Sequence, residues 1–159
     1  MQQFRKIALA FLVLGVLPGL SRGQEKESPS VKELIEIVKS SAPDKKRMQA
    51  VMALKELGPK AKDAVPALAD VLRKERSMVS YYALSALSKI GTDAVKDLID
   101  VMNDENAKSR LSAVQALAEM DPLPEAAMKA LQEAKTSKDK ELSSSADFWL
   151  QAVKKRNVK

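Results

Sequence analysis

The chain has 159 residues, 45% hydrophobic and 30% charged, a balance typical of a globular domain rather than a disordered one. It contains neither Cys nor His, which excludes disulfides, thiolate or imidazole metal ligands and nucleophile–histidine catalytic sites. The net charge of +6 falls to +3 without the three cations of residues 1–23, too weakly basic for an electrostatic nucleic-acid binder, and the composition predicts no cofactor.

Residues 1–23 have the pattern of a secretory signal peptide. Arg5 and Lys6 precede an apolar run from Ile7 to Leu17, and small residues precede a cleavage position before Gln24. This run is shorter than the roughly 20 apolar residues that a membrane-spanning helix needs. The sequence therefore predicts export to the periplasm or the outside, with no membrane contact after cleavage. Retention of the segment as an uncleaved anchor is the alternative.

After a polar linker at 24–29, residues 30–156 are predicted to form one all-α solenoid. Three strings are nearly alike: Ala53-Leu54-Lys55-Glu56-Leu57-Gly58, Ala86-Leu87-Ser88-Lys89-Ile90-Gly91 and Ala116-Leu117-Ala118-Glu119-Met120-Asp121. Their leucines are 33 and then 30 residues apart. Self-similarity at that period indicates stacked helix pairs, each too small to bury its apolar face alone.

An opening half-repeat is predicted at 30–40, where Ser30 and Glu33 form a capping box. Three helix pairs follow at 44–75, 77–104 and 106–136, and each first helix carries an apolar stripe. Gly58 and Gly91 stand where the first two of these first helices need a left-handed residue to end.

A final helix at 140–156 is predicted to cap the solenoid. Its Leu150 lies 33 residues after Leu117, in register with the first helices. Trp149 is expected to cover the open end together with Phe148, Leu142 and Val153, because a terminal repeat has no neighbour against its last apolar face.

These features resemble the HEAT-repeat family, in the short form found in bilin-lyase-like proteins. The likeness is carried by the A-L-x-x-[LI]-G strings, by Pro66 early in a second helix and by an acid-to-arginine relation between helices. It implies a HEAT/armadillo-like superhelix with an internal ladder, in which an acid of one second helix bonds an arginine of the following first helix. Asp100 with Arg110 matches this motif, and Glu36 with Arg47 matches it more loosely. The ladder is interrupted at Asp70, because Ser80 stands where its arginine partner would be.

A curved scaffold without catalytic groups is predicted to be a non-enzymatic protein-interaction module, with its second helices lining the concave side. Candidate contact residues there are Lys62, Asp63, Asp70, Lys96, Asp97 and Lys129. The recurring acids Asp70, Asp100 and Glu133 are interpreted either as ladder rungs or as a row that binds a cation or a basic partner.

Tyr82 is a further candidate contact residue. It aligns with the polar Gln49 and Ser112, so its ring is predicted to be exposed, whereas Tyr81 aligns with apolar residues and is predicted to be core. Exposed tyrosines are frequent at interaction hot spots.

Two other functions stay open. The resemblance implies a bilin-lyase-like accessory enzyme as one alternative, and a structural spacer in an envelope assembly is the other. The sequence identifies neither the protein partner nor the oligomeric state.

Overall fold

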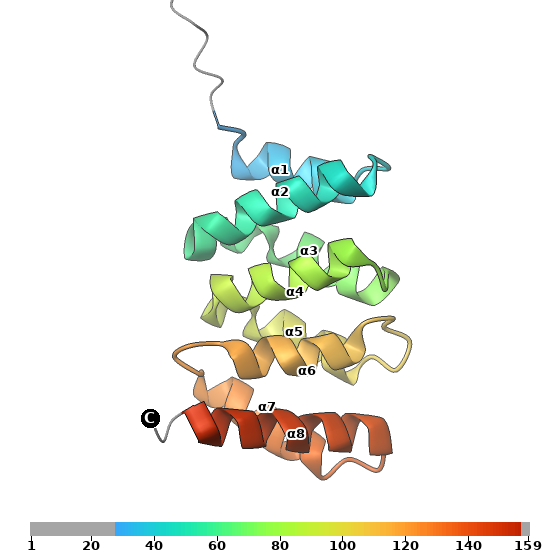
Figure 1. The fold of residues 1–159 in the computed structure, drawn as a ribbon, viewed down its shortest axis with the longest axis vertical. Helices are drawn as coiled ribbons and strands as arrows, with labels where there is room; N and C mark the ends of the chain where they lie inside the picture. Colours follow the sequence, from blue (N-terminus) through green and yellow to red (C-terminus); the bar gives the residue numbers. More distant parts are fainter. Residues whose placement is uncertain (1–27, 157–159) are drawn as a thin grey trace, which may run out of the picture.

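The computed structural model describes residues 28–156, which form eight α-helices stacked in two layers (Figure 1). The helices are α1 (Val31–Lys39), α2 (Asp44–Leu57), α3 (Val65–Lys74), α4 (Met78–Ile90), α5 (Val95–Asn103), α6 (Arg110–Glu119), α7 (Glu125–Lys135) and α8 (Lys140–Arg156). Two 3₁₀ segments, η1 (Gly58–Ala64) and η2 (Thr92–Ala94), connect α2 to α3 and α4 to α5. The predicted signal peptide at 1–23 lies outside the described residues, as does most of the linker at 24–29.

The first helices α2, α4, α6 and α8 form the front layer of Figure 1, and α1, α3, α5 and α7 form the layer behind it. Consecutive helices of the front layer pack on one another, and each also packs on members of the rear layer. The predicted all-α solenoid of helix pairs is therefore confirmed. In this stack α1 occupies the place of a second helix.

The helix ends follow from local chemistry. Ser30 caps α1 through the capping box with Glu33, whose carboxylate accepts from the Ser30 backbone N–H at 2.7 Å. Gly58 and Gly91 end α2 and α4 with φ values of 54° and 86°, a region that side-chain-bearing residues rarely adopt. In contrast, α6 ends at Met120 with extended backbone, directly before Asp121-Pro122.

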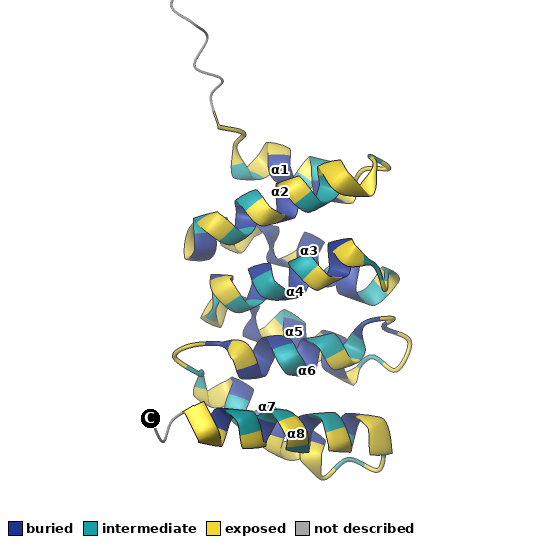
Figure 2. Cartoon of the chain, in the orientation of Figure 1, coloured by how far each residue is buried: buried dark blue, intermediate teal, exposed yellow. Residues whose placement is uncertain are grey.

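One core cluster is shared by the two layers, and Figure 2 shows buried segments on helices of both. Leu54, Leu87 and Leu117 are fully buried, one on each of three consecutive first helices. Four buried alanines recur one helical turn before the equivalent leucines: Ala50, Ala83, Ala113 and Ala146. These alanines keep the buried side chains small at one register of the core, which suits closely packed helices.

The last helix α8 closes the core with three of the four predicted side chains, Leu142, Trp149 and Val153, but not with Phe148. Leu142, Ala146, Leu150 and Val153 are buried against α6 and α7. Trp149 is half-buried against this core, but Phe148 is 65% exposed and touches Trp149 edge-on. The prediction that Phe148 belongs to the lid was wrong, because it lies about 200° around the helix from Ala146, which faces inward.

Among the described residues, no helix combines the length and the apolar character needed to cross a membrane.

Leu87→Ala tests the central layer of the core. The side chain is fully buried on α4, so its loss should lower the free energy of unfolding by about 2–5 kcal/mol. Leu111→Ala is the matched control, since Leu111 is 36% exposed on α6 and its loss should cost less than about 1 kcal/mol. Urea unfolding followed by circular dichroism measures both. Equal effects would contradict the assigned core.

Candidate functional site

The predicted ladder arginine Arg47 has other partners than Glu36. Its guanidinium forms a two-point ion pair with Glu75, in the connection between α3 and α4, and its Nε donates to the carbonyl of Val38 at 3.0 Å. Glu36 instead faces solvent and contacts Lys39 at 4.0 Å. The correction follows from position: Arg47 lies beside the C-terminal end of α1, where carbonyl groups lack intrahelical partners and attract a cation.

Arg110 repeats this arrangement at the other end of the solenoid. Its Nε donates to the carbonyl of Met102 at 3.3 Å, and its Nη1 lies 2.5 Å from Asp139, in the connection before α8. Asp139 also caps α8 by accepting from the backbone N–H of Glu141 and Leu142. The predicted partner Asp100 is exposed on the outer side of α5, so that prediction was wrong as well.

We call Arg47 with Glu75, and Arg110 with Asp139, the two clamps. Between them, Ser80 occupies the equivalent position on α4, and its side chain is too short to reach the end of a second helix. The connection before α6 approaches instead, and the backbone N–H of Ser109 donates to the carbonyl of Leu72 at 2.9 Å. The Ser109 hydroxyl donates to the carbonyl of Glu75 at 2.6 Å and lies 3.4 Å from Ser80 Oγ. The ladder that the sequence showed as interrupted is continued here by backbone hydrogen bonds.

The pKa values of the two clamp acids, Glu75 and Asp139, are lowered. The side-chain hydrogen bond from Arg47 lowers the pKa of Glu75 below its ordinary value of 4.5, and the same contact raises the pKa of Arg47. For Asp139, the backbone hydrogen bond from Leu142 is the main cause that lowers the pKa, followed by the side-chain bond from Arg110. The sequence spacing could have indicated both acids as arginine partners, because Glu75 and Asp139 follow Arg47 and Arg110 by 28 and 29 residues.

The residues predicted to contact a partner are dispersed over the second-helix side. Lys62 and Asp63 are exposed but belong to η1 rather than to a second helix, because α3 begins only at Val65. Lys96 is exposed and Asp97 half-buried on α5, and the ammonium of Lys129 on α7 lies 3.9 Å from Glu133 in the same helix.

Asp63 and Asp70 line one shallow groove of about 320 Å³ between α1 and α3. Asp70 is neutralised within its own helix, by Lys74 at 3.0 Å and Arg73 at 3.3 Å. The hydrogen bond from Lys74 is the main cause that lowers its pKa. The row of Asp70, Asp100 and Glu133 thus forms no ladder, and its first and last members have cationic neighbours in their own helices.

The two tyrosines have the opposite burial to that predicted. Tyr82 is half-buried and packs on the core, whereas Tyr81 is 60% exposed, with the two rings 5.8 Å apart and edge-on. The alignment failed because the equivalent positions are themselves at the rim: Met48 is half-buried and Leu111 exposed. An apolar residue at this register therefore does not indicate core.

The large exposed apolar side chains of the described residues all lie on first helices. They are Met52 on α2, Met78 and Tyr81 on α4, Leu111 on α6 and Phe148 on α8, with exposed fractions of 46%, 57%, 60%, 36% and 65%. Tyr81 and Leu111 hold the same register on neighbouring helices. These exposed apolar side chains are the candidates for an interaction surface on the first helices.

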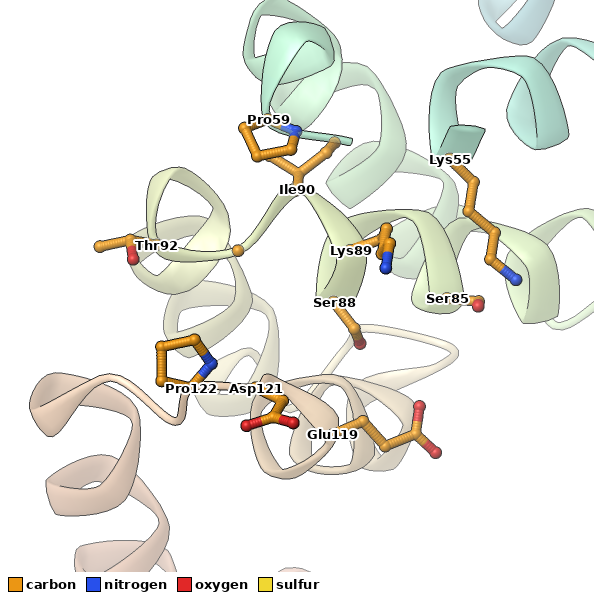
Figure 3. Close-up of a pocket in the computed structure, with 11 residues that line it drawn as sticks. Lys55, Pro59, Ser85, Ser88, Lys89, Ile90, Thr92, Glu119, Asp121 and Pro122 are labelled. Carbon is orange, nitrogen blue, oxygen red and sulfur yellow. The ribbon is translucent and has the colours of Figure 1, made fainter. Parts of the chain in front are cut away.

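A groove of about 540 Å³ opens at the C-terminal ends of α2, α4 and α6 (Figure 3). Lys55, Lys89, Glu119 and Asp121 supply its charged lining, and Pro59 and Pro122 supply rigid walls. The Ser88 hydroxyl in its lining lies 2.9 Å from the carbonyl of Ala116 and links α4 to α6. Sequence reasoning missed this groove, because its lining comes from three helices and the three connections that follow them.

Within residues 28–156, no group of three or more Asp or Glu side chains is placed to hold a metal ion.

Comparisons with known proteins give one family and one fold likeness. A family model described as HEAT repeats matches residues 31–118. None of the curated proteins compared matches the chain. Eight chains of solved structures match it, among them the crystal structure of an engineered protein that is 24% identical, with a TM-score of 0.47. That match covers 79% of this chain and 62% of the engineered one, so the chain spans less than two thirds of its length.

Glu75→Gln tests the clamp. It leaves the half-buried Arg47 guanidinium with only the exposed carboxylate of Asp44, 3.6 Å away, so the free energy of unfolding should fall by about 1–2 kcal/mol at neutral pH. Because the pKa of Glu75 is lower in the folded than in the unfolded chain, its contribution is present above the unfolded pKa and is lost as the pH falls through the folded one. The difference between wild type and variant should therefore shrink in acid.

Urea unfolding at a series of pH values from neutral to strongly acidic measures this difference. Glu36→Gln is the matched control, since Glu36 is the partner that the sequence predicted and its side chain is 71% exposed. A larger loss in the Glu36 variant than in the Glu75 variant would contradict the clamp.

Proposed function

Since the chain belongs to the HEAT-repeat family, we propose that it is a non-catalytic scaffold that binds another protein through the face formed by its first helices. The exposed apolar side chains on α2, α4, α6 and α8 are the observation that carries this proposal. Burying such groups against a partner removes apolar surface from water, the main favourable term in protein association.

The second-helix side offers weaker support for a contact surface. The charged candidates Lys129 and Asp70 are matched by neighbours in their own helices, and surface ion pairs of this kind contribute little binding energy. We therefore place the principal contact on the first helices and keep the second-helix candidates as the competing surface in the test below.

We also propose that the protein acts outside the cytoplasm. The charged, apolar and small-residue pattern of residues 1–23 supports this proposal, and it is independent of the fold.

Tyr81→Ser combined with Phe148→Ser should abolish capture of the natural partner from the cells that make this protein. Both side chains are mostly exposed, so the melting temperature should stay within a few degrees of wild type. Affinity capture with quantitative mass spectrometry compares this variant with Lys62→Glu combined with Lys96→Glu, which alters only the second-helix side.

A protein that wild type and the lysine variant capture, but the Tyr81/Phe148 variant does not, would support the first-helix face. Loss in the lysine variant alone would place the contact on the second-helix side and contradict our choice of face. Enrichment of nothing but the chain itself would favour the spacer and contradict the binding function.

The mature protein is expected to begin at Gln24. N-terminal sequencing of the protein recovered from its own cells, with fractionation of the envelope and medium, measures this start. A chain that retains Met1 and stays in the cytoplasmic fraction would contradict export, whereas an intact chain in the membrane fraction would indicate an uncleaved anchor.

A further inference from the structure

The groove at the C-terminal ends of α2, α4 and α6 is lined by four charged side chains that form no ion pairs with the protein. Within the described residues, none of Lys55, Lys89, Glu119 and Asp121 has an oppositely charged side chain within 4 Å. Glu119 accepts a hydrogen bond from the side-chain amide of Gln115, at 2.7 Å. Most charged side chains of residues 28–156 likewise have no ion-pair partner within 4 Å, so the four charges of the groove are available to a ligand without the loss of an existing ion pair.

The charges are segregated by sign across the opening. Lys55 and Lys89 extend from α2 and α4 on one side, and Glu119 and Asp121 lie on α6 and its following turn on the other (Figure 3). A ligand with one charge would be attracted to one side and repelled by the other. A ligand that carries an anionic and a cationic group satisfies both sides at once, and such complementarity gives specificity.

The rest of the lining suits a polypeptide backbone. Pro59 and Pro122 form rigid walls, and Thr92 and Ser85 offer hydroxyls. No atom lies within 4 Å of the position that a Cβ would take at Gly91, so the groove is open above this residue. A glycine that leaves its backbone open permits the close approach of another chain.

We propose that this groove binds an extended segment of a partner protein that carries an acidic and a basic side chain a few residues apart. The acidic side chain contacts Lys55 and Lys89, and the basic one contacts Glu119 and Asp121. This inference rests on the proposed function and gives it a partner chemistry. The groove is formed by the C-terminal ends of first helices, and the exposed Tyr81 and Leu111 lie near the N-terminal ends of α4 and α6.

The test is a nuclear magnetic resonance titration of the full-length, ¹⁵N-labelled chain with synthetic peptides. The probes are acetylated and amidated glycine peptides that contain one Asp and one Arg, with zero to four glycines between them. The amides of Gly91 and Thr92 report occupancy of the groove. We expect saturable shifts with at least one spacing, and an affinity about two- to fivefold lower when Asp is replaced by Asn or Arg by Gln, because each probe then loses one of two charge contacts.

Three variants test the assignment to these side chains. Lys89→Glu and Glu119→Lys should each weaken binding about tenfold, since each places a like charge against the ligand. The two changes together leave one charge of each sign on both sides of the groove, because Lys55 and Asp121 are unchanged, so the double variant should bind no more tightly than either single variant. Lys60→Glu is the matched control, because Lys60 is exposed beside the groove but does not line it. All three altered side chains are exposed, so unchanged melting temperatures verify folding.

Absence of saturable shifts with every spacing would overturn the proposal, as would equal affinity for the neutralised probes. Binding of free arginine or free aspartate as tightly as the peptide would also overturn it, by identifying a small-molecule site. Failure of the groove is separable from failure of the scaffold function: a natural partner that Lys89→Glu still captures, but the Tyr81/Phe148 variant does not, removes the groove and leaves the scaffold.

Discussion

The close packing of the helices around small, buried alanine side chains is the constraint on which the rest of the structure depends. Ala50, Ala83, Ala113 and Ala146 are buried at the same register in α2, α4, α6 and α8. A larger side chain there would separate neighbouring helices and leave voids around the leucines one turn later, and voids in a core are costly. The equivalence of α8 to the other first helices follows, because it supplies both Ala146 and Leu150.

The stacking also decides where polar contacts are needed. Each second helix ends beside the next first helix, and its last carbonyl groups require donors. Arg47 and Arg110 supply donors to Val38 and Met102, whereas the backbone of Ser109 supplies one to Leu72. Three equivalent helix ends are thus satisfied in two different ways. The short Ser80 is accommodated because a connecting segment moves into the space that an arginine side chain occupies elsewhere.

The two layers differ in what they present to a partner. The second helices carry charges that are often matched in the same helix, as Asp70 is by Lys74. The first helices carry exposed apolar groups, and at their C-terminal ends they leave charges unmatched across a groove. The proposed scaffold function and the proposed groove therefore both use the first helices, which offer apolar burial as well as charge complementarity.

The sequence by itself determined the architecture, because helix periodicity, a repeat near 30 residues and glycines such as Gly58 and Gly91 are local signals that need no knowledge of packing. It did not determine the clamps, the burial of the tyrosines or the groove. Tyr81 and Tyr82 differ by about 100° around α4, and only contact with α2 and α6 decides which ring is covered. The partners of Arg47, and the charges that meet across the groove, depend on how far apart separate helices lie in space, and the tertiary structure alone decides that distance.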